Sequence, residues 1–213
     1  MKPQQLALFV GLSLSALSAT TLSTQALASQ ANDPQRVFSQ AYKNYLAAVK
    51  ADENVQQAAE LAYTSGKAVY GKNDDNTANL AINFAKAING YGTELTEQRF
   101  NLYKEAHTIL AGNHGEQSVE VIDALFGQAN FAPSAYQADN YLEQIIEIAE
   151  TQNNPKFVAD MKLEAATLLA KKHSHKKYRE AKNYLEAADE YYRENVPNGS
   201  VEQIKADFLM ASF

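Results

Sequence analysis

The side chains that could carry out chemistry in this chain are four histidines and a few neighbouring carboxylates. His173 and His175 form the closest histidine pair, but four of the other residues in segment 171–177 are lysines. A zinc site needs three or four ligands, and clustered positive charge repels a metal cation. We therefore interpret this segment as a solvated turn, with a basic contact for an acidic partner as the alternative.

The remaining histidines, His107 and His114, lack the His-Glu-x-x-His spacing of zinc hydrolases. Acidic pairs occur at 74–75 and 189–190, where helix capping and solubility explain them as well as acid–base catalysis does. The sequence also lacks a nucleophile elbow and a glycine-rich phosphate loop. It therefore predicts no catalytic, cofactor-binding or metal-binding residue, and a cell-envelope enzyme is only the third functional alternative.

Residues 1–28 differ in composition from the rest of the chain. Lys2 is their only charged residue, an apolar run covers residues 6–17, and an Ala-Leu-Ala triplet ends at Ala28. This pattern predicts a secretory signal peptide that is cleaved after Ala28, because the apolar run is shorter than the about 20 residues that span a bilayer. An uncleaved anchor is the alternative. Residues 29–33 are expected to form a short flexible N-terminus.

The overall composition narrows the compartment and the class of partner. The chain has 213 residues, a formal net charge of -6 and no cysteine. An acidic chain is a poor ligand for phosphate backbones, so nucleic acid is not an expected partner. Without disulfides, an exported domain depends on its apolar core. Together with the signal peptide, these features predict a periplasmic protein with no membrane span in the mature chain.

From Pro34 onward the apolar residues recur at helical spacing, so we expect an all-α fold. The spacing predicts helices over residues 35–50, 54–70, 96–111, 134–150 and 178–195. Between them, further helices are expected to open after similar polar segments. These segments lie at 71–77, 112–118, 154–155 and 197–200. Thr77 is the expected cap in the first segment, and Ser118 is the expected cap in the second.

The openings repeat with a period of 41 to 42 residues, which is typical of an α-solenoid built from helix pairs. In the second helix of one unit, the pattern Tyr178, Glu180, Ala181, Leu185 and Ala188 resembles the tetratricopeptide repeat. The long period resembles that of kinesin light chains. This resemblance implies a right-handed α-solenoid of antiparallel helix pairs over residues 34–213.

The first helices of the units resemble the same family less uniformly. Asn83-Phe84-Ala85 matches the family's pattern, whereas Phe126-Gly127 matches only with a shift of one residue. In such a solenoid the first helices line a concave groove that binds a protein or peptide partner. By resemblance, Asn79, Asn83 and Lys86 occupy the groove positions. The alternative is an ordinary polar surface facing solvent.

Residues 200–213 are expected to form the first helix of a fourth, incomplete unit. Phe208, Leu209, Met210 and Phe213 are too apolar for a capping helix. The helix either folds back on the third unit, or the natural protein continues. The main functional expectation is a periplasmic scaffold that binds a protein partner without catalysis. The alternative resembles the repeat region of TonB-type energy transducers, which serve outer-membrane transport.

Overall fold

The computed structural model describes residues 33–172 and 178–212. Within these residues the chain forms nine α-helices, one short 3-10 helix and no strand, which confirms the all-α prediction. The expected signal peptide and the His173–His175 pair lie outside the described residues. The elements are α2 (Pro34–Ala51), α3 (Val55–Tyr70), α4 (Asp75–Ala87), α5 (Thr93–His114), η1 (Val119–Val121), α6 (Ile122–Phe131), α7 (Ala135–Thr151), α8 (Pro155–Lys171), α9 (Tyr178–Asn195) and α10 (Val201–Met210).

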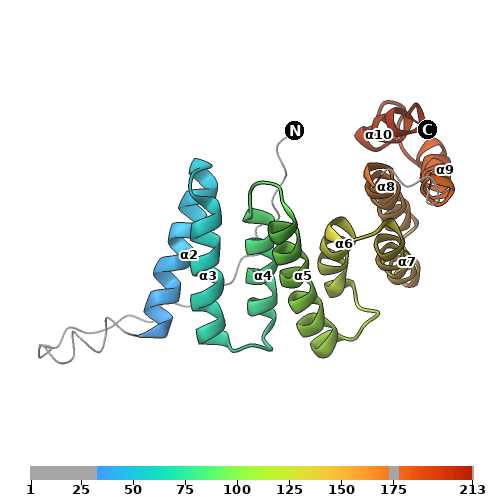
Figure 1. Ribbon diagram of the computed structural model, residues 1–213. Coiled ribbons are helices and arrows are strands. Elements are labelled where there is room, and N and C mark those ends of the chain that lie inside the picture. Colours follow the sequence, from blue (N-terminus) through green and yellow to red (C-terminus); the bar gives the residue numbers. More distant parts are fainter. Residues whose placement is uncertain (1–32, 173–177, 213) are drawn as a thin grey trace, which may run out of the picture.

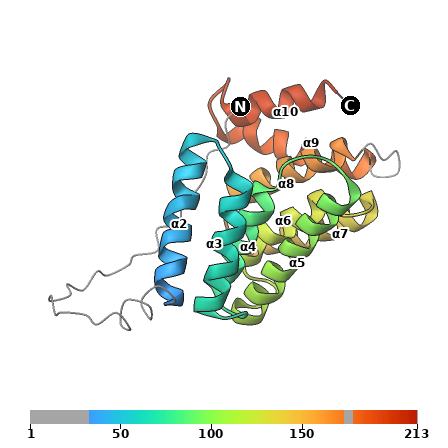
Figure 2. The same ribbon diagram turned by 60° about the vertical axis from the view of Figure 1, so that its left-hand side comes forward.

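The helices form an extended array in which each one packs against the next along the chain (Figure 1). Short connections make neighbouring helices antiparallel, and α2 and α10 lie at opposite ends of the array. Contacts beyond sequential neighbours include α4 with α6 and α8 with α10. The turned view shows that the later helices run across the direction of α2 and α3 (Figure 2). This is an arrangement of stacked helix pairs: α2–α3, α4–α5, α6–α7 and α8–α9, followed by α10.

Local sequence signals fix where several helices begin. Asp33 accepts a hydrogen bond from the Gln35 backbone at 3.1 Å, and Pro34 occupies the first turn of α2. Asn154 caps α8 in the same way, again followed by proline, and accepts from the Phe157 amide at 3.1 Å. Ser200 caps α10. The predicted openings at 154–155 and 197–200 are therefore confirmed.

Two corrections concern the expected hydroxyl caps. Asp74, not Thr77, caps α4, and Thr77 lies inside the first turn, where its hydroxyl donates to the Gly71 carbonyl at 2.6 Å. The Asp74 carboxylate precedes the Asn76 amide by two residues and accepts a hydrogen bond from it. The Thr77 hydroxyl follows that amide in the chain and does not cap the helix. Ser118 precedes the 3-10 helix η1 and makes no capping hydrogen bond, so α6 starts only at Ile122.

The core consists of two clusters of buried side chains. The larger one runs from α2 to α8 and reaches Ala181 of α9, while the smaller one joins α8, α9 and α10. The small and large residues expected to close the α8–α9 pair are confirmed, because Ala181, Leu185 and Ala188 are all fully buried. Burying apolar surface between successive pairs is what holds such an array together.

Glycine permits one particularly close approach between helices. Gly127 of α6 lies against the ring of Tyr103 of α5, and a Cβ added there would overlap that ring. Tyr103 also stacks on Phe131, with ring centroids 6.0 Å apart. Gly127 therefore allows α5 and α6 to pack with an aromatic ring between them.

Candidate functional site

Three of the sequence-predicted residues lie on the accessible side of α4. Most of this helix is buried, but Asn79 and Asn83 are half-buried and Lys86 is exposed. Residues spaced three or four apart share a helix face, so the three side chains form one stripe, which we call the α4 stripe. The structure thus brings the predicted residues together on one surface.

Lys86 also connects two units. Its Nζ lies 2.6 Å from Oδ2 of Asp123 on α6, and the two side chains are 52% and 56% exposed. Because the pair is so open to water, its contribution to stability is small. Lys86 and Asp123 therefore present a paired positive and negative charge at the end of the α4 stripe.

Asn79 and Asn83 make no side-chain hydrogen bond to any other residue in the part of the chain that the structure describes. Each amide offers two N–H donors and one carbonyl acceptor. Half-buried amides with free hydrogen-bonding capacity can pair with both the N–H and C=O groups of an extended peptide. In this respect Asn79 and Asn83 differ from Lys86, which is already paired with Asp123.

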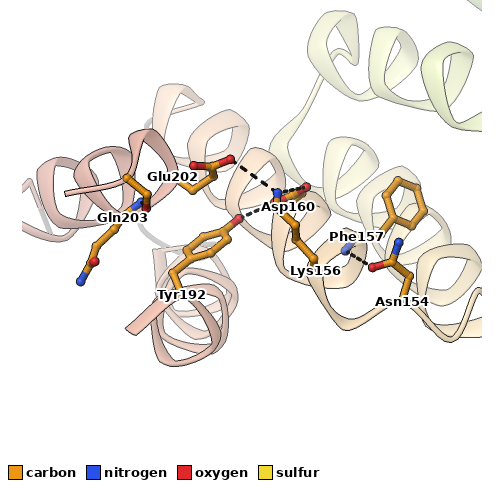
Figure 3. Close-up of polar contacts among 8 residues, drawn as sticks. Asn154, Lys156, Phe157, Asp160, Tyr192, Glu202 and Gln203 are labelled. Carbon is orange, nitrogen blue, oxygen red and sulfur yellow. Dashed lines mark hydrogen bonds and ion pairs between the residues drawn. The ribbon is translucent and has the colours of Figure 1, made fainter. Parts of the chain in front are cut away.

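The most extensive polar cluster joins α8, α9 and α10 (Figure 3). The buried Tyr192 hydroxyl donates to Asp160 Oδ1 at 3.0 Å, and Lys156 Nζ lies 3.0 Å from both oxygens of Asp160. Lys156 also approaches Glu202 of α10 at 3.5 Å. In the view, Lys156 and Tyr192 both reach Asp160, and Glu202 of α10 reaches the amino group of Lys156.

The protonation states in this cluster favour a structural role. The hydrogen bond to Asp160 is the main cause that raises the pKa of Lys156, which stays charged. Burial, followed by the hydrogen bond to Asp160, raises the pKa of Tyr192, which stays neutral. A general base needs a pKa near the working pH, and both shifts move away from neutrality. The cluster therefore fastens α10 to the α8–α9 pair.

Two cations bind the ends of first helices, which sequence reasoning missed. Arg99 of α5 donates to the carbonyls of Ile88 and Gly90 after α4, at 2.6 and 3.0 Å. Lys172 donates to the carbonyls of Asn130 and Ala132 at the end of α6, at 2.8 and 2.9 Å. Free carbonyls at a helix C-terminus attract cations. Lys172, predicted as part of a solvated turn, is half-buried, and this desolvation lowers its pKa.

The two described histidines tie the end of α5 to neighbouring segments. His114 Nε2 lies 2.6 Å from Oδ2 of Asp75 at the start of α4, and Asn113 donates to the other Asp75 oxygen at 2.8 Å. These contacts, led by the Asn113 hydrogen bond, lower the pKa of Asp75. His107 Nε2 lies 3.1 Å from a carboxylate oxygen of Glu116 but is not hydrogen-bonded to it. Among the described residues, no group of three histidine or acidic side chains could hold a metal ion.

Two shallow grooves lie away from the α4 stripe. One, of about 470 Å³, is lined by Glu150, Lys162 and Tyr191 among others, and Lys162 pairs with Glu150 at 3.3 Å. The other, of about 370 Å³, runs along α5 and is lined largely by glutamates and amides. Neither contains a nucleophile next to a base, so neither has the arrangement of an active site.

Comparison with known proteins identifies no relative of this chain. No protein-family model matches the chain, and neither curated proteins nor solved structures gave a match. None of the helices within residues 33–172 and 178–212 combines the length and the apolar character that a membrane span needs.

Proposed function

We propose that this chain is an exported, periplasmic helical-repeat scaffold that binds another protein without catalysing a reaction. The α4 stripe carries the proposal, because Asn79 and Asn83 keep unused hydrogen-bonding groups on an otherwise buried helix. A polar group held partly out of water gains more from a matching partner than a fully exposed one does. The binding surface in this proposal is a concave groove formed by the first helices of the pairs.

The packing of the helices supports the placement of that groove. The pairs α4–α6 and α8–α10, which pack together although they are not sequential neighbours, both consist of first helices. In a curved stack, elements on the inner side approach their counterparts in the next unit more closely than elements on the outer side do. First helices on the inner side are what the proposed right-handed, tetratricopeptide-like solenoid requires.

The proposed ligand is an extended peptide segment of the partner. Asn79 and Asn83 lie four residues apart on one face, so their amides can contact successive polar groups of an extended backbone. The Lys86–Asp123 pair beside them can exchange its mutual contact for a charged side chain of the partner. Amides supply orientation, while the exposed charges influence the rate of association.

The test compares capture of periplasmic proteins by the wild-type chain and by the double variant Asn79→Ala/Asn83→Ala. We expect the captured partner to fall at least tenfold, since two half-buried hydrogen-bonding sites are lost together. Gln98→Ala/Asn101→Ala, which removes two exposed amides from α5, is the matched control and should capture normally. Equal capture by both double variants, with unchanged helical content, would reject the α4 stripe as the binding surface.

A further inference from the structure

The last described helix leaves an apolar face uncovered. Val201, Ile204 and Phe208 of α10 are 64%, 57% and 80% exposed. On its opposite side, Ala206 is fully buried, and Leu209 and Met210 pack against the smaller core cluster. The helix is thus attached to α9 through one face and presents a second apolar face to solvent. We call Ile204, Phe208 and Ala211 the α10 stripe.

The contacts of α8 with its preceding helix identify what this second face of α10 corresponds to. Lys162 of α8 pairs with Glu150 of the preceding helix α7, and Asp207 of α10 pairs with Arg193 of the preceding helix α9. Asp207 lies 45 residues after Lys162. With the same offset, Met161, which packs on the core shared with α7, corresponds to Ala206, which is buried against α9. The two helices therefore contact their predecessors through corresponding faces, which sets a register of 45 residues between α8 and α10, although Glu150 and Arg193 themselves lie 43 residues apart.

The same register assigns a role to the α10 stripe. Ala159, Leu163 and Ala166 of α8 share the smaller core cluster with Leu185, Ala188 and Tyr192 of α9. The residues 45 positions later are Ile204, Phe208 and Ala211, which form the α10 stripe. The uncovered face of α10 is thus the counterpart of the face of α8 that α9 covers. An antiparallel amphipathic helix is the element that fits it.

Charge further defines that helix. Asp160, which accepts the Tyr192 hydroxyl of α9, corresponds to Lys205 on α10. Lys205 is exposed, and its amino group forms no ion pair within 4.0 Å in the described part of the chain. A helix packed on the α10 stripe would place the side chain equivalent to Tyr192 opposite this cation. A carboxylate at that position is therefore the complementary group.

We propose that the α10 stripe is a docking site for an acidic amphipathic helix of a partner protein. The helix packs antiparallel on α10, as α9 packs on α8, and pairs a carboxylate with Lys205. A second copy stacked end to end fits less well, because the outward side of α2 carries Arg36, Lys43 and Lys50, which would face Lys205. This surface is separate from the α4 stripe and does not depend on it.

The probe is a blocked, fluorescent peptide with the sequence of residues 178–195 and the change Tyr192→Glu. Titration of the full chain should give saturable binding by fluorescence anisotropy. Phe208→Glu and Ile204→Glu should each weaken it at least tenfold. Leu61→Glu, at a 56% exposed apolar residue of α3, should leave it unchanged and is the matched control. These variants change surface side chains, so circular dichroism should show intact helices.

A charge exchange tests the predicted pairing with Lys205. Lys205→Glu should weaken the peptide, and a peptide with Tyr192→Lys should recover the lost affinity on that variant. The proposal is overturned by absent binding, by binding that Phe208→Glu does not alter, or by a dimer that Phe208→Glu dissociates in sedimentation. Unaltered binding would mean that the peptide exchanges with α9, and a dimer would mean that a second copy covers the stripe. Asn79→Ala/Asn83→Ala should bind the peptide normally.

Discussion

At the scale of single residues, several polar side chains removed from water connect one helix to another. Tyr192 is the clearest case, because it is fully buried in the α9 packing face and its hydroxyl reaches Asp160 on α8. Arg99 and Lys172 act at helix ends in the same connecting role. The α4 stripe differs from these residues because Asn79 and Asn83 are not used within the described fold. Their unused hydrogen-bonding capacity, on the same helix face as Lys86, makes them candidate binding residues.

Replacing Tyr192 by phenylalanine should destabilise the protein at neutral pH and protect it at alkaline pH. Loss of the hydroxyl costs about 1.5–3 kcal/mol, because it removes a hydrogen bond to a carboxylate. In the wild type, burial raises the pKa of Tyr192 above its ordinary value of 10.0. The stabilisation from the neutral phenol is therefore complete below pH 10 and declines as the pH rises further. Urea unfolding followed by circular dichroism at several pH values measures both effects.

The control for this prediction is Tyr91→Phe, at a fully exposed tyrosine in the loop before α5. It should change neither the free energy of unfolding at neutral pH nor its decline above pH 10. If the free energy of unfolding falls as steeply above pH 10 in Tyr192→Phe as in the wild type, other groups cause that fall. The burial of Tyr103 and Tyr184 also raises the pKa of each, so the decline should be reduced rather than abolished.

Residue spacing predicted some of the packing residues but not the contacts between helices. Ala181, Leu185 and Ala188 could be assigned to a packing face because their positions repeat with the helix period. The roles of Arg99 and Lys172 could not be predicted in this way. Their side chains bind carbonyls at the ends of other helices, and no local sequence pattern marks such a contact. The partnership of Tyr192 with Asp160 spans 32 residues and depends on how two helices face each other. The accessibility of Asn79 and Asn83 was anticipated, whereas the Lys86–Asp123 pair was not.

At the scale of helices, the close contact of α5 and α6 depends on Gly127. Its lack of a side chain leaves room for the Tyr103 ring, which in turn stacks on Phe131. The sequence matched this position to the repeat pattern only with a shift of one residue. The 3-10 helix η1 gives a physical reason, because it delays the start of α6 to Ile122.

Gly127→Ala is expected to destabilise the protein by about 1–3 kcal/mol, because the added methyl forces the Tyr103 ring or the helices apart. Gly112→Ala is the control, since it lies inside α5 with no atom near the added Cβ. That change should be neutral or stabilise by up to about 1 kcal/mol, because alanine is the better helix former. Thermal unfolding of the two variants distinguishes them. Similar melting temperatures would contradict the proposed close packing at Gly127.

Helix existence followed from the sequence more readily than helix ends. All five helices predicted by spacing are present, but α5 extends from Thr93 to His114 rather than over residues 96–111. Its ends are fixed by Gly92 and Gly115, both with positive φ, rather than by the apolar pattern. The prediction that Thr77 caps α4 was wrong, because Asp74 and Thr77 are both residue types that commonly cap helices. Only the backbone geometry distinguishes them.

At the scale of the whole molecule, the array of helix pairs presents two separate surfaces. The helix that carries the α4 stripe, α4, lies inside the array, whereas α10 lies at the end opposite α2 (Figure 1). The period predicted from the sequence is consistent with the pairing of the helices, whereas the exposed face of α10 follows from its correspondence with α8 at an offset of 45 residues. The handedness of the array and the identity of the partner depend on geometry and chemistry that a period does not encode.

Site-specific photo-crosslinking in intact cells tests the central proposal, a protein partner bound at the α4 stripe, most directly. A photoreactive amino acid replaces Asn83 in the full chain, and the same replacement at Lys104, exposed on α5, provides the control. The account predicts a discrete crosslinked adduct from position 83 in the periplasmic fraction and none from position 104. Equal adducts from both positions, or no adduct from position 83, would contradict it.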